Sequence, residues 1–341
     1  MPKYGKEYVN LQINGSPNIQ NMSYTIMFYN LENLYDTVDD PTTNDDEFTP
    51  TGAKRWTQPK YQRKLDNLSE VFSTVSNAYG GFPVIVGVSE VENDTVLGDL
   101  AAKRRMNGAH YKWVHYESND ARGVDVGLYY RPDKFTLVGS EPVKLVLRSG
   151  REYIGRDILC VWGKLDGEMF CFYVCHFLSR RTGVDASAGF RRAGAETVRD
   201  HAAEMGKKYP GIKVVVMGDM NDCPSDESLS MLLHAKRNIH QVEEGEYFNP
   251  FWILQDMGKG TSLHNHHWKL YDNIIVSRNM LDMTAGVKGL RIVRIDQQFY
   301  GEIFSRKFMM QSGQPRRSYI GNNFQSGYSD HLPVLIKINN R

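Results

Sequence analysis

Short apolar runs separated by polar turns dominate the chain from residue 23 onward. The runs are rich in Val, Ile, Phe and Tyr and are bounded by Gly, Asp or Asn, which is typical of β-strands. Several runs are apolar at every position, which predicts strands with both faces buried. Asp166-Gly167 separates two of the runs and predicts a tight hairpin turn. We predict strands at residues 25–29, 83–88, 126–130, 158–165, 169–175, 213–218, 273–277 and 332–338.

Helical segments lie between these strands. The spacing of apolar residues predicts an amphipathic helix over residues 61–78, a second over 184–208 and a shorter one over 227–235. Buried strands combined with amphipathic helices favour two packed sheets with helices outside. We therefore predict an α/β (α+β) fold, a four-layer α/β/β/α sandwich of two mixed, mainly antiparallel sheets. The connection over residues 236–272 is long and Gly/His-rich, and such loops are usually functional or disordered.

The domain organisation follows from length and composition. The chain has 341 residues, 41% of them hydrophobic, which is enough for a substantial core. Residues 1–21 are polar and predict a disordered or extended lead-in, and residues 22–341 show no linker or repeat and predict one domain. No run approaches the roughly 20 apolar residues of a membrane span, and the N-terminus lacks a signal-peptide core. This slightly favours the cytoplasm, while secretion or a periplasmic location needs a removed signal peptide. The oligomeric state is open.

Charge and cysteine content narrow the function classes. The formal net charge is +1, which argues against a general basic field that holds nucleic acid. Cys171 and Cys175 lie on one predicted strand, about 13 Å apart at the usual rise per residue. A disulfide needs Cα atoms within roughly 7 Å, so these two cannot pair. With Cys160 and Cys223, they match no zinc-ligand spacing, and we predict four reduced thiols.

Polar side chains gather at the ends of the predicted strands. One group directly follows strands: Asn30, Glu32, Glu90, His176, Asp219 and Asn221. A second group directly precedes the last two strands: Asp272, Asp330 and His331. If those two strands run antiparallel to the others, both groups lie at one edge of the fold.

Such a group of side chains has a definite chemistry. Carboxylates a few ångströms apart repel one another unless a cation lies between them. Oxygen-rich sites suit Mg²⁺, Mn²⁺ or Ca²⁺ rather than zinc, and histidines titrate near neutral pH and supply an acid or a base. A hard cation and an acid or base are what phosphoester hydrolysis requires. We therefore predict one or two Mg²⁺ or Mn²⁺ ions, with Ca²⁺ as the alternative, and a phosphate-ester substrate.

Seven segments resemble motifs of the endonuclease/exonuclease/phosphatase superfamily, which has the DNase I-like fold. They occur in the family's order and span most of the chain, and the opening NLENLYD resembles a bacterial branch of unassigned substrate. The segments are FYNLENLYD (28–36), VIVGVSEVEN (84–93), GVDVGLYYRPDKF (123–135), CFYVCHFLSR (171–180), VVMGDMNDCP (215–224), YDNIIVS (271–277) and GYSDHLPV (327–334).

The resemblance implies which residues bind the metal and the phosphate. Glu90 is similar to the family's metal-binding glutamate, and Asn30 to the asparagine that supports metal and phosphate. Glu32 stands where some members use a second acid, and Asp330 where they have a second metal ligand or an orienting carboxylate. Arg156 matches, more loosely, a phosphate-contacting arginine. From the residues alone, Glu32 could equally pair with a lysine.

The resemblance also implies the catalytic residues. His176 is similar to the first catalytic histidine, and Asp272 to the acid that orients it. Asp219 and Asn221 match the pair that holds the nucleophilic water and the phosphate. His331 matches the histidine that contacts the phosphate. Taken alone, His176 could also be a capped interior histidine.

The sequence leaves the substrate and the roles of several residues undecided. The substrate is a phosphodiester or a phosphomonoester, and a lipid or sugar phosphate is the alternative, which the aromatic segment 241–256 suits. A non-catalytic binding protein on the same scaffold is disfavoured, because no motif acid or histidine is missing. Glu92 stands where related nucleases carry a groove-reading arginine, so we expect it to repel a DNA backbone. Trp56 is a candidate substrate contact. Surface or loop roles are expected for His264, His266, His267 and the arginine pairs 180–181, 191–192 and 316–317.

Overall fold

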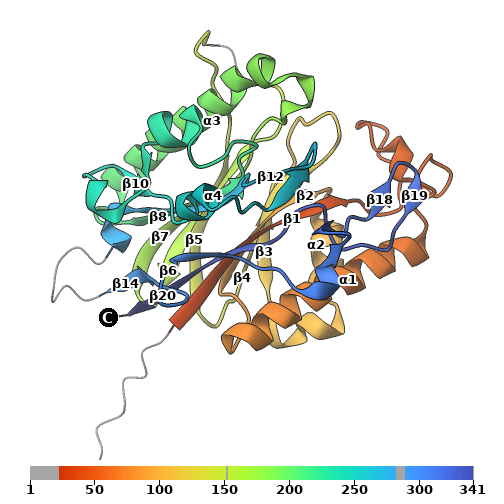
Figure 1. Cartoon of the computed structure of the whole chain (residues 1–341), viewed down its shortest axis with the longest axis horizontal. Helices are drawn as coiled ribbons and strands as arrows, with labels where there is room; N and C mark the ends of the chain where they lie inside the picture. Colours follow the sequence, from red (N-terminus) through yellow and green to blue (C-terminus); the bar gives the residue numbers. More distant parts are fainter. Residues whose placement is uncertain (1–22, 151–152, 282–288, 341) are drawn as a thin grey trace, which may run out of the picture.

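Two seven-stranded sheets lie face to face at the centre of the computed structural model (Figure 1). The structure describes residues 23–150, 153–281 and 289–340, so the predicted lead-in over 1–21 lies outside the described residues. The first sheet has the order β14-β20-β1-β2-β4-β3, with β15 also paired to β20. Its strands are β1 (Ser23–Leu34), β2 (Ile85–Val91), β3 (Lys112–His115), β4 (Asp125–Tyr130), β14 (Leu290–Val293), β15 (Gly301–Ile303) and β20 (Val334–Asn340).

The second sheet has the order β5-β6-β7-β8-β13-β10-β9. The pairs β1–β2, β7–β8 and β9–β10 are parallel and the other pairs are antiparallel, so both sheets are mixed and mainly antiparallel, as predicted. Asp166 and Gly167 join β6 to β7 with positive φ angles of 53° and 81°, which the predicted tight turn requires. The strands are β5 (Phe135–Val143), β6 (Ile158–Leu165), β7 (Glu168–His176), β8 (Lys213–Asp219), β9 (Ala235–Lys236), β10 (Tyr247–Phe248) and β13 (Asp272–Ser277).

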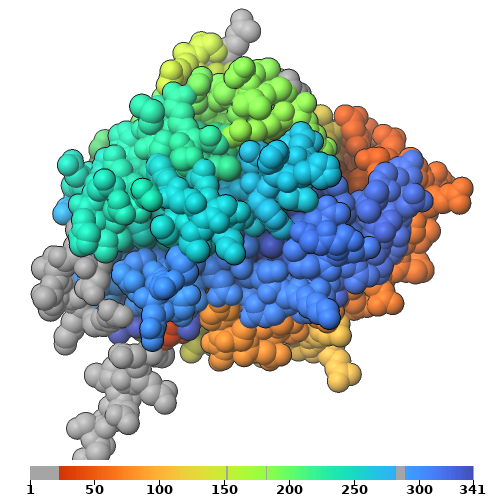
Figure 2. All heavy atoms as spheres, in the orientation of Figure 1, coloured from red at the N-terminus to blue at the C-terminus, as the bar shows by residue number. Residues whose placement is uncertain are grey.

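Helices cover the outer faces of both sheets, which confirms the four-layer sandwich. Helices α1 (Gln58–Tyr79) and α2 (Asp94–Ala101) pack on the first sheet, and α3 (Val184–Lys208) packs on the second. Figure 2 shows the blue C-terminal residues filling the visible face between the green α3 side and the orange α1 side. None of the helices in the described part of the chain combines the length and the apolar character that crossing a bilayer requires.

The segment between β8 and β13 differs from its prediction. The helix expected over 227–235 is a single turn (Ser228–Leu232), and the long connection contains β10, α4 (Trp252–Asp256) and the hairpin β11 (Ser262–His264)–β12 (His267–Lys269). Further hairpins are β16 (Met310–Gln311)–β17 (Gln314–Pro315) and β18 (Tyr319–Ile320)–β19 (Asn323–Phe324). Short helical turns are Asp46–Phe48, Arg104–Ala109, Arg180–Thr182, Ile239–Gln241, Arg278–Met280 and Lys307–Met309.

Several aromatic side chains pack in the interior instead of facing a ligand. Trp56 is 1% exposed, and its indole N–H donates to the Tyr35 carbonyl at 3.0 Å, so most of this side chain packs in the interior and its role as a substrate contact stays a prediction. Tyr247, Phe248 and Phe251 are buried, which removes the support that segment 241–256 gave to a lipid substrate. All four cysteines are free thiols, as predicted.

Candidate active site

The topology brings the two groups of strand-end residues to one edge. β13 pairs antiparallel with β8, and β20 pairs antiparallel with β1, which confirms the predicted direction of the last two strands. Residues that precede β13 and β20 therefore lie beside residues that follow β8 and β1. The structure brings together acids and histidines from both sheets at this edge.

His176, Asp219 and Asp272 form a row across three neighbouring strands of the second sheet. Asp219 is the register partner of His176 across β7–β8 and of Asp272 across β8–β13. All three side chains are buried. The His176 Nε2 atom lies 3.7 Å from Asp219 Oδ2 and 3.9 Å from Glu90 Oε1. Two adjacent buried carboxylates repel each other, so this row favours a bound positive charge.

Asp272 pairs with His331, and the prediction that it orients His176 is wrong. The Asp272 Oδ2 atom lies 2.7 Å from His331 Nδ1. The turn before β20 places His331 over the second sheet, because Ser329 Oγ donates to the Asn30 carbonyl at 2.7 Å and accepts the His331 N–H at 3.0 Å. His176 keeps a buried Nδ1 atom without a hydrogen-bond partner.

Glu90 reaches the site because it occupies a β-bulge. The register of β2 with β4 skips from Ser89 to Val91, and Glu90 has a positive φ of 59°. A bulge turns a side chain out of the regular alternation of the strand. The carboxylate then accepts the Asn33 N–H at 2.9 Å and lies 3.6 Å from Arg122. Positive φ angles at four non-glycine residues of this edge concentrate backbone strain there: Glu32, Asn33, Glu90 and Asn221.

Asn30 and Glu32 occupy different environments. The Asn30 NH₂ group donates to Asp219 at 3.1 Å and faces Glu90 at 3.5 Å, while its carbonyl oxygen accepts the Glu32 N–H. Asn30 therefore orients carboxylates and does not present an oxygen to a cation in this arrangement. Glu32 turns away from the site, accepts the Ser318 N–H at 2.6 Å and lies 3.5 Å from Lys64. The structure does not place Glu32 among the metal-ligand candidates.

Arg156 also differs from its prediction. It is buried, and it donates to the His176 carbonyl at 3.1 Å and to Asp120 at 2.8 Å. Its donors are occupied inside the protein, so it supports the strand end and does not face a phosphate. Asp330, in contrast, lies at the site and pairs with Arg317 at 2.8 Å.

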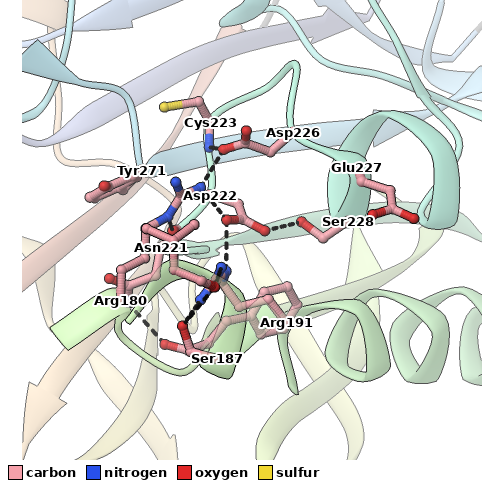
Figure 3. A network of polar contacts seen from close by, with 12 residues as sticks. Arg180, Ser187, Arg191, Asn221, Asp222, Cys223, Asp226, Glu227, Ser228 and Tyr271 are labelled. Carbon is pink, nitrogen blue, oxygen red and sulfur yellow. Dashed lines mark hydrogen bonds and ion pairs between the residues drawn. The ribbon is translucent and has the colours of Figure 1, made fainter. Parts of the chain in front are cut away.

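A charged network holds the loop that follows β8 (Figure 3). Arg180 donates to the Asn221 carbonyl at 2.7 Å, forms ion pairs with Asp222 and Asp226, and lies over the Tyr271 ring. The buried Arg191 reaches Asp222 from behind at 2.7 Å. Asn221 itself donates through its side chain to the Phe177 carbonyl at 2.9 Å. The backbone of this loop is therefore fixed before any ligand binds.

These elements enclose a pocket with a volume of about 260 Å³. Six predicted residues line it: Glu90, His176, Asp219, Asn221, Asp330 and His331. Sequence reasoning missed the other polar lining residues: Arg122, Ser179, Arg180, Arg181, Ser262, His264, Tyr271 and Arg317. Arg122 just precedes β4, which is antiparallel to β2, so the rule that identified Asp272 also predicts its position. Arg180 and Arg181, which follow His176 closely, line the pocket, so the prediction of a surface role for this pair is wrong.

The environment of the site shifts the pKa values of Glu90 and Asp219 in opposite directions. Burial opposes ionisation of Glu90, but the charges of Arg122 and His331 and the hydrogen bond from the Asn33 N–H outweigh it and lower the pKa of Glu90 to about 2. Burial raises the pKa of Asp219 to about 7, with Asp272 adding to the effect and His331 opposing it. One carboxylate is thus firmly ionised, while the other exchanges its proton near neutral pH.

The environment also shifts the pKa values of the two histidines in opposite directions. Burial and the positive charge of Arg156 hold the pKa of His176 well below its usual value. Burial also disfavours the charged form of His331, but Asp272 and Asp219 raise its pKa well above the usual value. A neutral and a protonated imidazole in one pocket can act as a proton acceptor and a proton donor.

The residues present fit a hard divalent cation. Oxygen atoms of Asp219 and Asp272 lie within 4.8 Å of each other, beside His331, whose raised pKa keeps the ring protonated so that it offers no ligand nitrogen, and Glu90 stands ionised at the pocket wall. The buried Oδ1 atom of Asp272 has no hydrogen-bond partner. Clustered carboxylates with an unsatisfied oxygen are the donor set that Mg²⁺ and Mn²⁺ prefer.

Glu92 is buried, although its predicted repulsion of a DNA backbone requires an exposed carboxylate. It is 7% exposed, and its carboxylate accepts the Asp36 N–H at 2.6 Å. The expected repulsion of a DNA backbone by this acid is therefore not supported. The position still carries no arginine.

Comparison with known proteins gives a family match and structural neighbours. A sequence model described as the Endonuclease/Exonuclease/phosphatase family matches residues 25–340. No curated protein matches the chain. Solved structures with the same fold include an endonuclease/exonuclease/phosphatase family protein from Bacteroides thetaiotaomicron (17% identity, 94% of this chain and 98% of that chain, TM-score 0.55). The fold is also similar to that of a mannosyl-6-phosphatase from the same organism (16% identity, 93% of this chain and 99% of that chain, TM-score 0.54). It is similar as well to the human nocturnin catalytic domain with bound sulfate (15% identity, 94% of this chain and 96% of that chain, TM-score 0.53).

Proposed function

The chain belongs to the endonuclease/exonuclease/phosphatase family, a family of phosphoesterases, and we propose that it is a divalent-metal-dependent hydrolase of a compact phosphate ester. The observation that carries the proposal is the meeting of Glu90, the row His176–Asp219–Asp272 and His331 at one pocket with arginines in its wall. The two sheets share one apolar core, which supports the further proposal that residues 22–341 form one domain.

Each residue receives a role from its environment. Glu90, ionised and at the pocket wall, would hold Mg²⁺ or Mn²⁺, with Asp330 as a further oxygen donor and Asn30 orienting the carboxylates. The bound cation would neutralise charge on the phosphoryl group. Asp219, with a pKa of about 7, would accept the proton of the attacking water.

The remaining polar residues would act on the phosphate. His331, kept protonated by Asp272, would donate to a phosphoryl oxygen and protonate the leaving oxygen. His176 would contact the phosphate as a neutral imidazole. Asn221, fixed by the Arg180 network, would donate a hydrogen bond to the same group.

Pocket size and lining favour a small substrate over duplex DNA. A volume of about 260 Å³ accommodates a phosphate and a group the size of a sugar. The wall offers arginines and hydroxyls, while Tyr271 is 7% exposed and lies under Arg180, so it offers no open face for a base to stack on. A sugar-like phosphomonoester fits these features best.

One observation favours a longer substrate as the second candidate. A neighbouring pocket of about 210 Å³ shares Arg181 and Arg317 with the first and is lined by Lys54 and Tyr319. A phosphodiester could place its scissile phosphate in the first pocket and its second substituent in the neighbouring one.

A direct assay tests the activity and separates the candidates. Purified protein is assayed on p-nitrophenyl phosphate, bis-p-nitrophenyl phosphate and single-stranded DNA, with Mg²⁺ and then with EDTA. We expect metal-dependent hydrolysis, faster on the monoester, that Glu90→Gln abolishes. Glu92→Gln is the matched control, because this neighbouring glutamate does not line the pocket and should leave turnover intact. Preference for the diester would favour the second candidate, and hydrolysis of none of the substrates would refute the proposal.

A further inference from the structure

A second group of metal-ligand side chains lies outside the pocket, around His115. His115 ends β3, Glu117 follows it, Asp125 begins β4 and Asp94 begins α2. None of these residues lines the catalytic pocket. They surround the two ends of the segment 116–124, which connects β3 to β4 and carries Asp120 and Arg122.

The acids surround the imidazole without hydrogen-bonding to it. His115 Nδ1 lies 3.9 Å from both Asp94 Oδ1 and Glu117 Oε1, and Nε2 lies 4.0 Å from Asp125 Oδ2. One donor atom each from His115, Glu117 and Asp125 falls within a mutual distance of 4.8 Å. Two donors bound to one ion at about 2.1 Å each lie about 3.4 Å apart at a tetrahedral angle, so the gap of 4.0 Å between Nε2 and Asp125 Oδ2 admits an ion once it closes by roughly 0.6 Å.

The imidazole is also an unpartnered polar group in the interior. The His115 side chain is 2% exposed, and its buried Nε2 atom has no hydrogen-bond partner. An unsatisfied buried nitrogen costs about 1–3 kcal/mol, and native proteins rarely leave one without a ligand, an ion or a water. The atom faces Asp125, whose two oxygens accept from Ser118 N–H at 3.2 Å and from Ser118 Oγ but retain free lone pairs.

The negative charge of the group is uncompensated by protein cations. In the described ranges, no Lys or Arg side chain pairs with Asp94, Glu117 or Asp125; Asp94 instead accepts the Trp113 indole N–H at 2.8 Å. The three carboxylates share one imidazole as their neighbour, so their negative charges repel one another. A bound cation would remove this repulsion and satisfy Nε2 at the same time.

We propose that His115, Glu117 and Asp125 form a structural site for a first-row transition dication, Zn²⁺ or Mn²⁺, that ties together the two ends of the 116–124 segment. An imidazole among carboxylates favours these ions over Mg²⁺, which prefers an all-oxygen shell. The site would fix Asp120, which binds Arg156 at 2.8 Å, and Arg122, which lies 3.6 Å from Glu90. The ion would thus stabilise one wall of the catalytic pocket without taking part in the reaction.

Metal counting with matched variants tests the proposal. Chelator-treated wild type, Glu117→Gln, His115→Asn and Glu90→Gln are loaded with ZnCl₂ or, separately, MnCl₂, desalted and measured by elemental mass spectrometry. We expect Glu117→Gln and His115→Asn to bind one ion fewer than wild type, or to bind it at least about 10-fold more weakly. Glu90→Gln should keep that ion, which separates this site from the catalytic one. Glu244→Gln, at a glutamate that is 96% exposed, is the control for a simple loss of surface charge.

Thermal melting gives a second readout that excludes misfolding. The Glu117 side chain is 67% exposed, so Glu117→Gln should fold, and without metal it should melt no lower than wild type because it relieves repulsion. Zn²⁺ should raise the melting temperature of Glu90→Gln and raise that of the double variant Glu90→Gln/Glu117→Gln much less. Equal ion counts and equal melting shifts with and without Glu117 would overturn the proposal, as would a Glu90→Gln protein that binds no ion.

Discussion

Replacing Asp272 with Asn perturbs the site at one atom pair. Asp272 is fully buried, and its Oδ2 atom lies 2.7 Å from His331 Nδ1. Asn has the same shape but no charge, and its NH₂ group can donate to Nδ1, which would favour the wrong imidazole tautomer. The substitution therefore removes the charge that, after the opposing effect of burial, contributes most to the raised pKa of His331.

The size of the effect follows from the lost interaction. A hydrogen bond to a charged group contributes about 1.5–3 kcal/mol, which corresponds to roughly 10- to 150-fold in rate. A wrong tautomer adds to this loss, up to about 10⁴-fold for a comparable aspartate–histidine pair. Folding should suffer little, because Asp272 also neighbours Asp219 in the sheet register and its neutralisation relieves their repulsion. We expect kcat to fall about 10²- to 10⁴-fold while the melting temperature changes by only a few degrees.

The assay is steady-state hydrolysis of p-nitrophenyl phosphate with Mg²⁺ across pH, together with NMR of the histidine rings. Protonated His331 persists in wild type until the pH rises through its raised pKa. In Asp272→Asn this pKa falls, so the variant should lose its remaining activity at a lower pH. The His331 ring signals should shift more than those of His176. An unchanged kcat, or a shift confined to His176, would refute the pairing.

Three further predictions test the surroundings of the site. Burial raises the pKa of Glu92 in the folded state to about 8, so the free energy of unfolding of the wild type should fall by at most about 5 kcal/mol as pH rises from about 4.5 to 8. Glu92→Gln should remove that decline in thermal melts recorded across this pH range. The same dependence of melting temperature on pH in wild type and variant would contradict the prediction. Arg156→Met should destabilise the protein by about 3–5 kcal/mol, because it leaves the half-buried Asp120 unpaired, and denaturant melts that match wild type would refute this. Arg181→Met should raise KM about 10-fold or more with an unchanged melting temperature, because Arg181 is exposed in the pocket wall, and an unaltered KM would exclude a phosphate contact.

Local patterns predicted the framework of the molecule well. Apolar runs located the long strands, and α3 matches its predicted bounds, because buried strands and amphipathic helices have distinct spacings. The edge that carries Asp219, Asp272 and His331 followed from strand ends once the last strands were assumed antiparallel, and the register confirms that assumption.

The wrong predictions concern side chains whose partners come from segments far apart in sequence. The partner of Asp272 is set by how the turn at Ser329 sits across the other sheet, and no local pattern encodes that placement. Position in the chain favours ligand roles for Arg156 and Glu32, but other protein groups satisfy their charges: Asp120 for Arg156, and Lys64 with the Ser318 N–H for Glu32. Their burial could not be inferred from residue type.

The central claim is that one edge of the sandwich binds a divalent cation and a phosphate together. Crystals soaked with Mn²⁺ and inorganic phosphate, with diffraction data collected at the manganese absorption edge, test it most directly. We predict an anomalous peak bound to Glu90, with phosphate oxygens in contact with His176, Asn221 and His331. Manganese and phosphate bound elsewhere, with the pocket containing only water, would contradict the account.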